Sequence, residues 1–157
     1  MIKINKAMKY IFEMTNVFDI TREESIMIEK HIKKLFDQIK IVKGCLILFE
    51  PTFNIYDENK FKKYVGNDIG FEVSQNEVNI NAELKRENIS NAIAFSFFSS
   101  FNCKLKNLYP EKDFCSILSF NTYNSWTFSF HIVRDDCELW INEDVDSYNN
   151  PVMYEIF

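Results

Sequence analysis

Two stretches of the chain place hydrophobic residues at the spacing of an amphipathic helix. The first follows Thr21, and Glu24 three residues later completes a capping box. Its apolar positions recur at helical spacing, at Ile28, Ile32, Leu35, Phe36 and Ile39. We expect a helix over 22–42, terminated by Gly44. The second stretch, 87–104, has apolar residues at strict four-residue steps, at Ile89, Ile93, Phe97, Phe101 and Leu105. Phe97, Phe98 and Phe101 are expected in the core.

Shorter segments have the pattern of β-strands. The run 45–49 is apolar and ends before Pro51, which is typical of a buried strand, and a second strand is predicted at 52–56. Residues 70–74 and 77–81 alternate with period two around Gln75 and Asn76, which predicts a hairpin with a two-residue loop. At least part of the sheet is therefore expected to be antiparallel.

The last third of the chain is aromatic-rich and alternates with period two. It predicts a three-strand meander over 115–120, 126–132 and 137–141. In the middle strand one face is apolar and the other carries Thr127, Ser129 and His131. His131 is therefore expected on the polar face of the sheet.

Together these elements predict an α+β fold, with a mainly antiparallel sheet and two or three helices packed on one face. The N-terminal segment 3–16 fits helical spacing and strand alternation equally, so both assignments stay open. The chain has no internal repeat, linker or break in composition, and 1–157 is expected to form a single domain.

Composition limits the available chemistry. Three glycines leave almost no material for a phosphate-binding or dinucleotide-binding loop. The two histidines, His31 and His131, lie far apart, and no two of the four cysteines are spaced Cys-x-x-Cys. Because acids flank Cys137, an activated thiolate is not expected there. We expect no metal or organic cofactor, no enzyme activity, and mostly buried, inert thiols.

The chain also lacks targeting features. Lys3, Lys6 and Lys9 interrupt the N-terminal segment, so it does not form the apolar region of a secretion signal. No segment approaches the roughly 18 apolar residues of a membrane span. The sequence therefore predicts a soluble, cytoplasmic protein with reduced cysteines and no membrane partner.

Charge is distributed unevenly along the chain. The net charge is −5, yet all 18 basic residues precede residue 135, and the segment from 135 to 157 contains seven acids and no Lys or Arg. Large aromatic residues are interleaved with these acids, a composition typical of protein-recognition surfaces. The candidate partner-binding residues are Asp135, Asp136, Glu138, Trp140, Glu143, Asp144, Asp146 and Tyr148. A solvated acidic surface that only aids solubility is the simpler interpretation.

Three other interpretations of the charged residues fit less well than a partner-binding surface. They are a calcium site, a hydrolytic carboxylate pair and a nucleic-acid surface. Asp144, Asp146, Asn150 and Glu155 match four positions of a calcium loop, but Asn149 stands at its glycine position and no amphipathic helices flank it. Adjacent carboxylates in a strand point to opposite faces, which disfavours paired-carboxylate hydrolysis. Nucleic-acid binding is not expected, because acids interleave with the lysines of the first helix.

The acidic, aromatic segment 126–144 and the Asn-, Ile- and Lys-rich composition resemble the immunity proteins of bacterial contact-dependent growth inhibition and polymorphic toxin systems. The resemblance is one of type, without a diagnostic motif. It implies a protein that binds the C-terminal domain of one cognate toxin, frequently a nuclease with a basic active-site cleft, and blocks it. The carboxylates would then face toxin Lys and Arg residues.

Two further classes stay open. One is a small-molecule sensor or enzyme with a pocket between the Phe-rich helix and the sheet, and the other is an acidic anti-repressor or nucleic-acid mimic. The sequence leaves the oligomeric state open.

Overall fold

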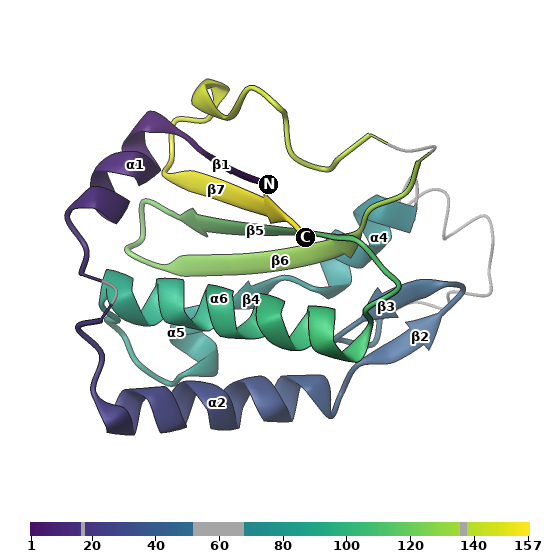
Figure 1. Ribbon diagram of the computed structural model, residues 1–157, viewed down its shortest axis with the longest axis horizontal. Helices are drawn as coiled ribbons and strands as arrows, with labels where there is room; N and C mark the ends of the chain where they lie inside the picture. The colour runs from purple at the N-terminus through teal and green to yellow at the C-terminus, as the bar shows by residue number, and fades with distance from the viewer. Residues whose placement is uncertain (17, 52–67, 136–137) are drawn as a thin grey trace.

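The fold is built on a five-stranded antiparallel sheet with the strand order β1-β7-β5-β6-β4 (Figure 1). The computed structural model describes residues 1–16, 18–51, 68–135 and 138–157. The strands are β1 (Ile2–Ile4), β4 (Val78–Asn79), β5 (Phe114–Phe120), β6 (Trp126–Ile132) and β7 (Val152–Ile156). A separate two-stranded sheet consists of β2 (Lys40–Val42) and β3 (Cys45–Ile47).

Helices α2 and α6 lie on one face of the main sheet, which we call the helix face (Figure 1). The α-helices are α1 (Lys6–Glu13), α2 (Arg22–Phe36), α4 (Asp68–Gln75), α5 (Ile80–Glu83) and α6 (Asn91–Leu108). The predicted capping box of Thr21 and Glu24 starts α2, and Ser90 caps α6. The predicted α+β class and its mainly antiparallel sheet are confirmed.

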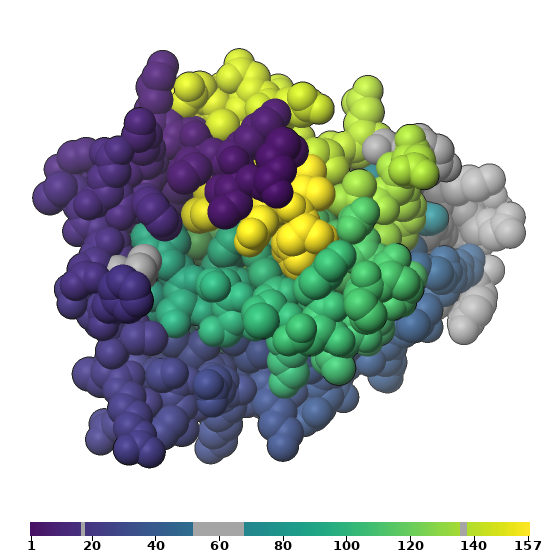
Figure 2. All heavy atoms as spheres, in the orientation of Figure 1, coloured from purple at the N-terminus to yellow at the C-terminus, as the bar shows by residue number. Residues whose placement is uncertain are grey.

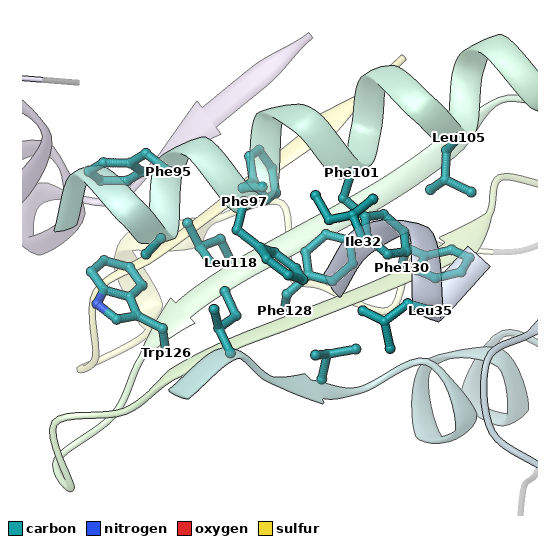
Figure 3. Close-up of a cluster of buried hydrophobic side chains, with 14 of the residues drawn as sticks. Ile32, Leu35, Phe95, Phe97, Phe101, Leu105, Leu118, Trp126, Phe128 and Phe130 are labelled. Carbon is teal, nitrogen blue, oxygen red and sulfur yellow. The ribbon is translucent and has the colours of Figure 1, made fainter. Parts of the chain in front are cut away.

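Aromatic side chains fill the layer between α6 and the sheet (Figure 3). Phe101 of α6 packs on Phe128 and Phe130 of β6, with ring centroids 4.6 and 5.4 Å apart. Phe97, Phe98 and Phe101 are all buried, as predicted. These large apolar surfaces supply most of the stability of the helix–sheet layer.

The first predicted helix ends earlier than its pattern indicated. Helix α2 stops at Phe36, and residues 40–42 pair with β3 instead of continuing the helix to 42. Lys43 and Gly44 both have positive φ, 50° and 80°, the backbone that a tight two-residue hairpin requires. Gly44 therefore terminates a strand and not a helix.

The hairpin predicted over 70–81 is wrong. Residues 68–75 form α4, and only Val78 and Asn79 join the sheet. The alternation was misleading because Glu72, the polar residue between Phe71 and Val73, is fully buried and does not face solvent. The strand predicted at 45–49 is confirmed over Cys45–Ile47, and the one at 52–56 lies outside the described residues.

The predicted meander is correct in its first two strands and wrong in the third. Strands β5 and β6 pair along their whole length, but the segment 138–141 is not a strand. Its expected place beside β6 is taken by the short strand β4, and β5 pairs on its other edge with β7, which in turn pairs with β1. The open question at the N-terminus is resolved as a strand followed by a helix.

The opposite side of the sheet, which we call the outer face, is covered by the segment 138–151. Its apolar residues Leu139, Ile141 and Val145 pack with Cys115 and Tyr154 in a second, smaller core. His131 lies on this face, as predicted, but it is buried there. None of the helices in the described ranges has the length and apolarity needed to cross a membrane.

Candidate functional site

A groove of about 260 Å³ opens on the outer face, between the sheet and the segment 138–151. Its floor carries the side chains of Ser119, Thr127 and Ser129. No hydrogen bond to another described residue uses these three hydroxyl groups, so they remain available to a bound molecule. The alternation of β5 and β6 explains the polar floor, because the apolar residues of these strands face the helices.

Two aromatic side chains from the covering segment line the same groove. Trp140 is 55% exposed and Tyr148 is 39% exposed. Trp140 faces the groove while its neighbours Leu139 and Ile141 join the outer core. The hydroxyl oxygen of Tyr148 accepts a hydrogen bond of 2.9 Å from the backbone N–H of Asn142, which fixes the position of the ring. The groove therefore presents two large, partly exposed rings.

Asn5 holds the covering segment in place. Its Nδ2 donates to the carbonyl oxygens of Tyr148 and Asn150, and its Oδ1 accepts from the backbone N–H of Val152 at 3.1 Å. The same Oδ1 caps α1 by accepting from the N–H of Met8. One buried side chain therefore ties the segment that bears Tyr148 to the N-terminus of the first helix.

The predicted acids divide into two groups. Glu143 pairs with Lys3 at 3.6 Å, and Asp146 pairs with Lys6 at 3.7 Å and also accepts from its backbone N–H. Asp135, Glu138 and Asp144 are exposed and make no ion pair with another described residue. Asp136 lies outside the described residues. The two lysine pairs could not be predicted from sequence, because Lys3 and Lys6 are distant in the chain.

The rim of the groove carries a further acid. Glu77 lines the groove, is exposed, and makes no ion pair with any residue in the described ranges. Glu138 and Glu143 border an adjoining depression that shares Ile141 with the groove. Sequence reasoning missed Glu77 because it assigned that residue to a hairpin. The polar alternation of β6 could have indicated Thr127 and Ser129.

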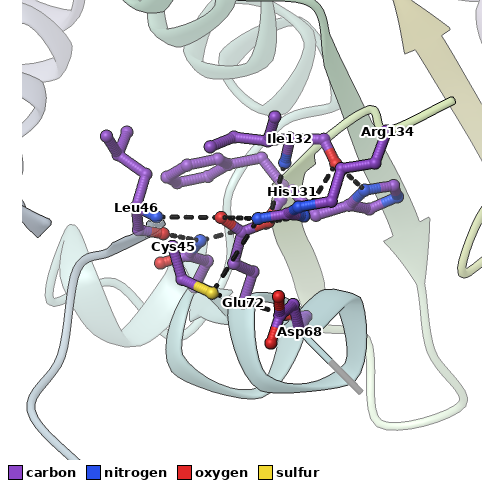
Figure 4. A network of polar contacts seen from close by, with 9 residues as sticks. Cys45, Leu46, Asp68, Glu72, His131, Ile132 and Arg134 are labelled. Atoms are coloured by element: carbon purple, nitrogen blue, oxygen red, sulfur yellow. Dashed lines mark hydrogen bonds and ion pairs between the residues drawn. The ribbon is translucent and has the colours of Figure 1, made fainter. Parts of the chain in front are cut away.

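A second polar cluster, centred on Glu72, lies at the end of the sheet near α4 (Figure 4). The carboxylate of Glu72 is fully buried and forms a two-pronged ion pair with Arg134 at 2.9 and 3.1 Å. It also accepts from the backbone N–H groups of Leu46 and Ile132. The hydrogen bonds that Arg134 donates to Glu72 raise the pKa of its guanidinium group. Four hydrogen bonds satisfy this carboxylate, so the cluster is structural.

Nucleophilic chemistry is disfavoured at the buried thiols. Burial raises the pKa of both Cys45 and Cys115 to about 12, and the nearby carboxylates of Glu72 and Asp68 add to the shift at Cys45. Burial also lowers the pKa of His131, whose Nδ1 lies 3.0 Å from the carbonyl oxygen of Ile132. These groups are neutral near pH 7. Within the described ranges, no three His, Cys, Asp or Glu side chains gather as a metal site.

The thiols should differ sharply in reactivity. Cys103 is exposed, whereas Cys45 and Cys115 are buried and uncharged. We expect iodoacetamide at pH 8 to modify Cys103 rapidly and the other two only as fast as the protein unfolds. Peptide mapping by mass spectrometry at successive times measures each site separately. Rapid native-state modification of Cys115 would contradict its placement in the outer core.

Fold and site together define an α+β protein with an acidic, aromatic groove on its outer face. A family model matches residues 3–156, and the chain belongs to the uncharacterized protein PM0498 family. Neither the curated proteins nor the solved structures contain a match.

Proposed function

We propose that this protein is an immunity protein that binds a cognate toxin domain and neutralises it through the outer groove. The observation that carries the proposal is the pairing of Trp140 and Tyr148 on one open groove that is also lined by the exposed carboxylate of Glu77. Large aromatic residues such as these dominate the binding energy of many protein interfaces. The toxin would meet the protein in the cytoplasm of the cell that it enters.

The charges at the groove favour a basic partner. Glu77 lines the groove and Glu138 lines the adjoining depression; both are exposed, and neither is neutralised by a lysine or arginine of the described chain. A nuclease presents Lys and Arg side chains to the phosphates of its substrate, so its cleft complements such a surface. Complementary charge also accelerates association, which suits an inhibitor that must act before the toxin does.

The groove supplies hydrogen-bonding groups as well as charge. A basic side chain that enters between Trp140 and Tyr148 reaches the free hydroxyls of Ser119, Thr127 and Ser129 on the floor. Cations stack favourably on aromatic faces, and a guanidinium group offers five N–H donors to such a floor. The proposed mode of inhibition is therefore occlusion of the active site by insertion of toxin Arg or Lys residues into the groove.

Charge reversal at the rim tests the proposal. The double variant Glu77→Lys with Glu138→Lys should fold normally, because both side chains are exposed and unpaired within the described chain. We expect its affinity for the toxin domain encoded by the adjacent upstream gene to fall at least about tenfold, or 1.4 kcal/mol. Isothermal titration calorimetry at several salt concentrations measures both the affinity and its salt dependence.

Glu29→Lys on the exposed face of α2 is the matched control and should bind like the wild type. The double variant should also show a weaker dependence of affinity on salt than the wild type. If wild type binds tightly and the double variant keeps both its affinity and its salt dependence, the outer groove is not the interface. If the wild type does not bind this toxin domain, the proposed function is wrong.

A further inference from the structure

A group of polar side chains interrupts the apolar layer between α6 and the helix face of the sheet. Glu155 of β7 points into this layer and is the register partner of Ser116 on β5. Asn102 of α6 faces both strands, and its Nδ2 donates a hydrogen bond of 2.9 Å to Oε2 of Glu155. This cluster lies on the opposite side of the sheet from the outer groove.

Two atoms of the cluster have unused hydrogen-bonding capacity. Asn102 is only 4% exposed, and neither its Oδ1 nor the Oγ of Ser116 has a hydrogen-bond partner in the described chain. The amide orientation of Asn102 is set by its neighbour, because only the NH₂ group can donate to the Glu155 carboxylate. Its Oδ1 must therefore be an acceptor without a donor.

Asn102 and Glu155 line a recess at the surface of the molecule. Two depressions of about 370 and 350 Å³ lie along α6 and share Ser99 and Glu155. The apolar residues that line the first depression are Ile2, Phe12, Phe95, Phe98 and Met153, and three serines of α6 line it as well. The second contains Asn102. Figure 2 shows the face on which N-terminal atoms in purple, C-terminal atoms in yellow and atoms of α6 in teal adjoin.

The recess combines one uncompensated negative charge with an apolar wall. Glu155 is partly exposed and makes no ion pair with any residue that the structure describes. Lys106 lines the second depression, but its Nζ already pairs with Asp113 at 3.3 Å and donates to the carbonyl oxygen of Lys112. At the other end, Phe12 packs edge-on against Phe95, with ring centroids 5.3 Å apart.

We infer that this recess binds a small organic amine. Its ammonium group donates hydrogen bonds to the carboxylate of Glu155, which Asn102 holds in place, and its apolar body lies against Phe12, Phe95 and Phe98. The volume of each depression lies in the range of small-molecule sites, roughly 300–1,000 Å³. The site is independent of the proposed toxin interface, because the two lie on opposite faces of the sheet.

Binding of phenethylamine tests the charge requirement. At pH 7 this amine is protonated and carries an aromatic body, and 2-phenylethanol and phenylacetate are its neutral and anionic counterparts. We expect calorimetry to show one saturable site for the amine with a dissociation constant below about 1 mM. The alcohol should bind at least about tenfold more weakly and the acid not measurably. Equal binding of amine and alcohol, or no saturable binding of the amine, would overturn the proposal.

Substitutions then locate the site. Glu155→Gln removes the charge but keeps an oxygen that accepts from Asn102, and it should weaken amine binding at least tenfold. Ser99→Phe places a ring where the two depressions meet; because Ser99 is exposed, this variant should fold and lose binding. The matched control Glu77→Gln, on the outer face, should bind like the wild type. Unchanged binding in Ser99→Phe, or loss of binding in Glu77→Gln, would place the amine elsewhere.

Discussion

The substitution Glu72→Ala is expected to lower the free energy of unfolding by about 3–5 kcal/mol relative to the wild type. The carboxylate of Glu72 is fully buried and accepts four hydrogen bonds, two from Arg134 and two from backbone N–H groups. Without it, the guanidinium of Arg134, whose side chain is 19% exposed, loses its ion-pair partner. The N–H groups of Leu46 and Ile132 lose their acceptors as well.

Urea denaturation followed by circular dichroism measures this loss. Glu29→Ala on the exposed face of α2 is the control and should change the free energy of unfolding by no more than about 0.5 kcal/mol. The double variant Glu72→Leu with Arg134→Met should be more stable than Glu72→Ala, since it removes the unpaired charge. A loss below about 1 kcal/mol in Glu72→Ala would show that the pair contributes little.

The large effect follows from where Glu72 stands in the architecture. Strands β3 and β6 belong to different sheets, and side chains of α4 connect them. The carboxylate of Glu72 accepts hydrogen bonds from the backbone N–H groups of Leu46 and Ile132. One turn later, the side chain of Asn76 accepts a hydrogen bond from the N–H of Leu48 and donates to the carbonyl oxygens of Leu46 and Phe130. These two side chains occupy the hydrogen-bonding positions that a further strand would otherwise fill. Helix α4 therefore fastens the small sheet to the large one.

This long-range role explains why the local pattern at 70–81 failed as a predictor. A glutamate between Phe71 and Val73 produces a strand-like alternation, and sequence alone places it toward solvent. Its burial depends on Arg134, which is 62 residues away in the chain. By contrast, α2 and α6 were predictable because their caps and apolar stripes are encoded locally.

The third strand failed for a different physical reason. In the predicted meander, 137–141 would lie beside β6, but Val78 and Asn79 of β4 pair with that edge instead. On the other side of the sheet, β5 pairs with β7, whose second edge pairs with β1, so the backbone hydrogen bonds of β7 are satisfied on both edges. The segment 138–141 instead buries Leu139 and Ile141 on the outer face. Such competition between segments is not visible in the local pattern of either.

For the candidate site, the sequence indicated the aromatic residues better than the charges. Trp140 and Tyr148 line the same groove, although eight positions separate them. The sequence could not show which acids are free to bind a partner, because Glu143 and Asp146 form ion pairs with Lys3 and Lys6 of the same chain. Glu77 reaches the groove from the connection between α4 and the edge strand β4, where the sequence predicted a strand of a hairpin.

The variant Trp140→Ala is expected to weaken binding of the toxin domain by at least 2 kcal/mol, about thirtyfold, with little loss of stability. Trp140 is 55% exposed, so its removal leaves no cavity in a core. Its ring forms one wall of the groove and would be covered by the partner. Calorimetry gives the affinity, and a thermal melt of each variant gives the stability.

Tyr123→Ala is the matched control, because Tyr123 is 88% exposed and does not line the groove. It should bind like the wild type. Fluorescence gives a second readout, since the chain has two tryptophans and Trp126 is buried. A blue shift on toxin binding in the wild type should be absent in Trp140→Ala, because only Trp140 moves from water into an interface. Wild-type affinity in Trp140→Ala, or the same shift in both proteins, would place the interface away from the outer groove.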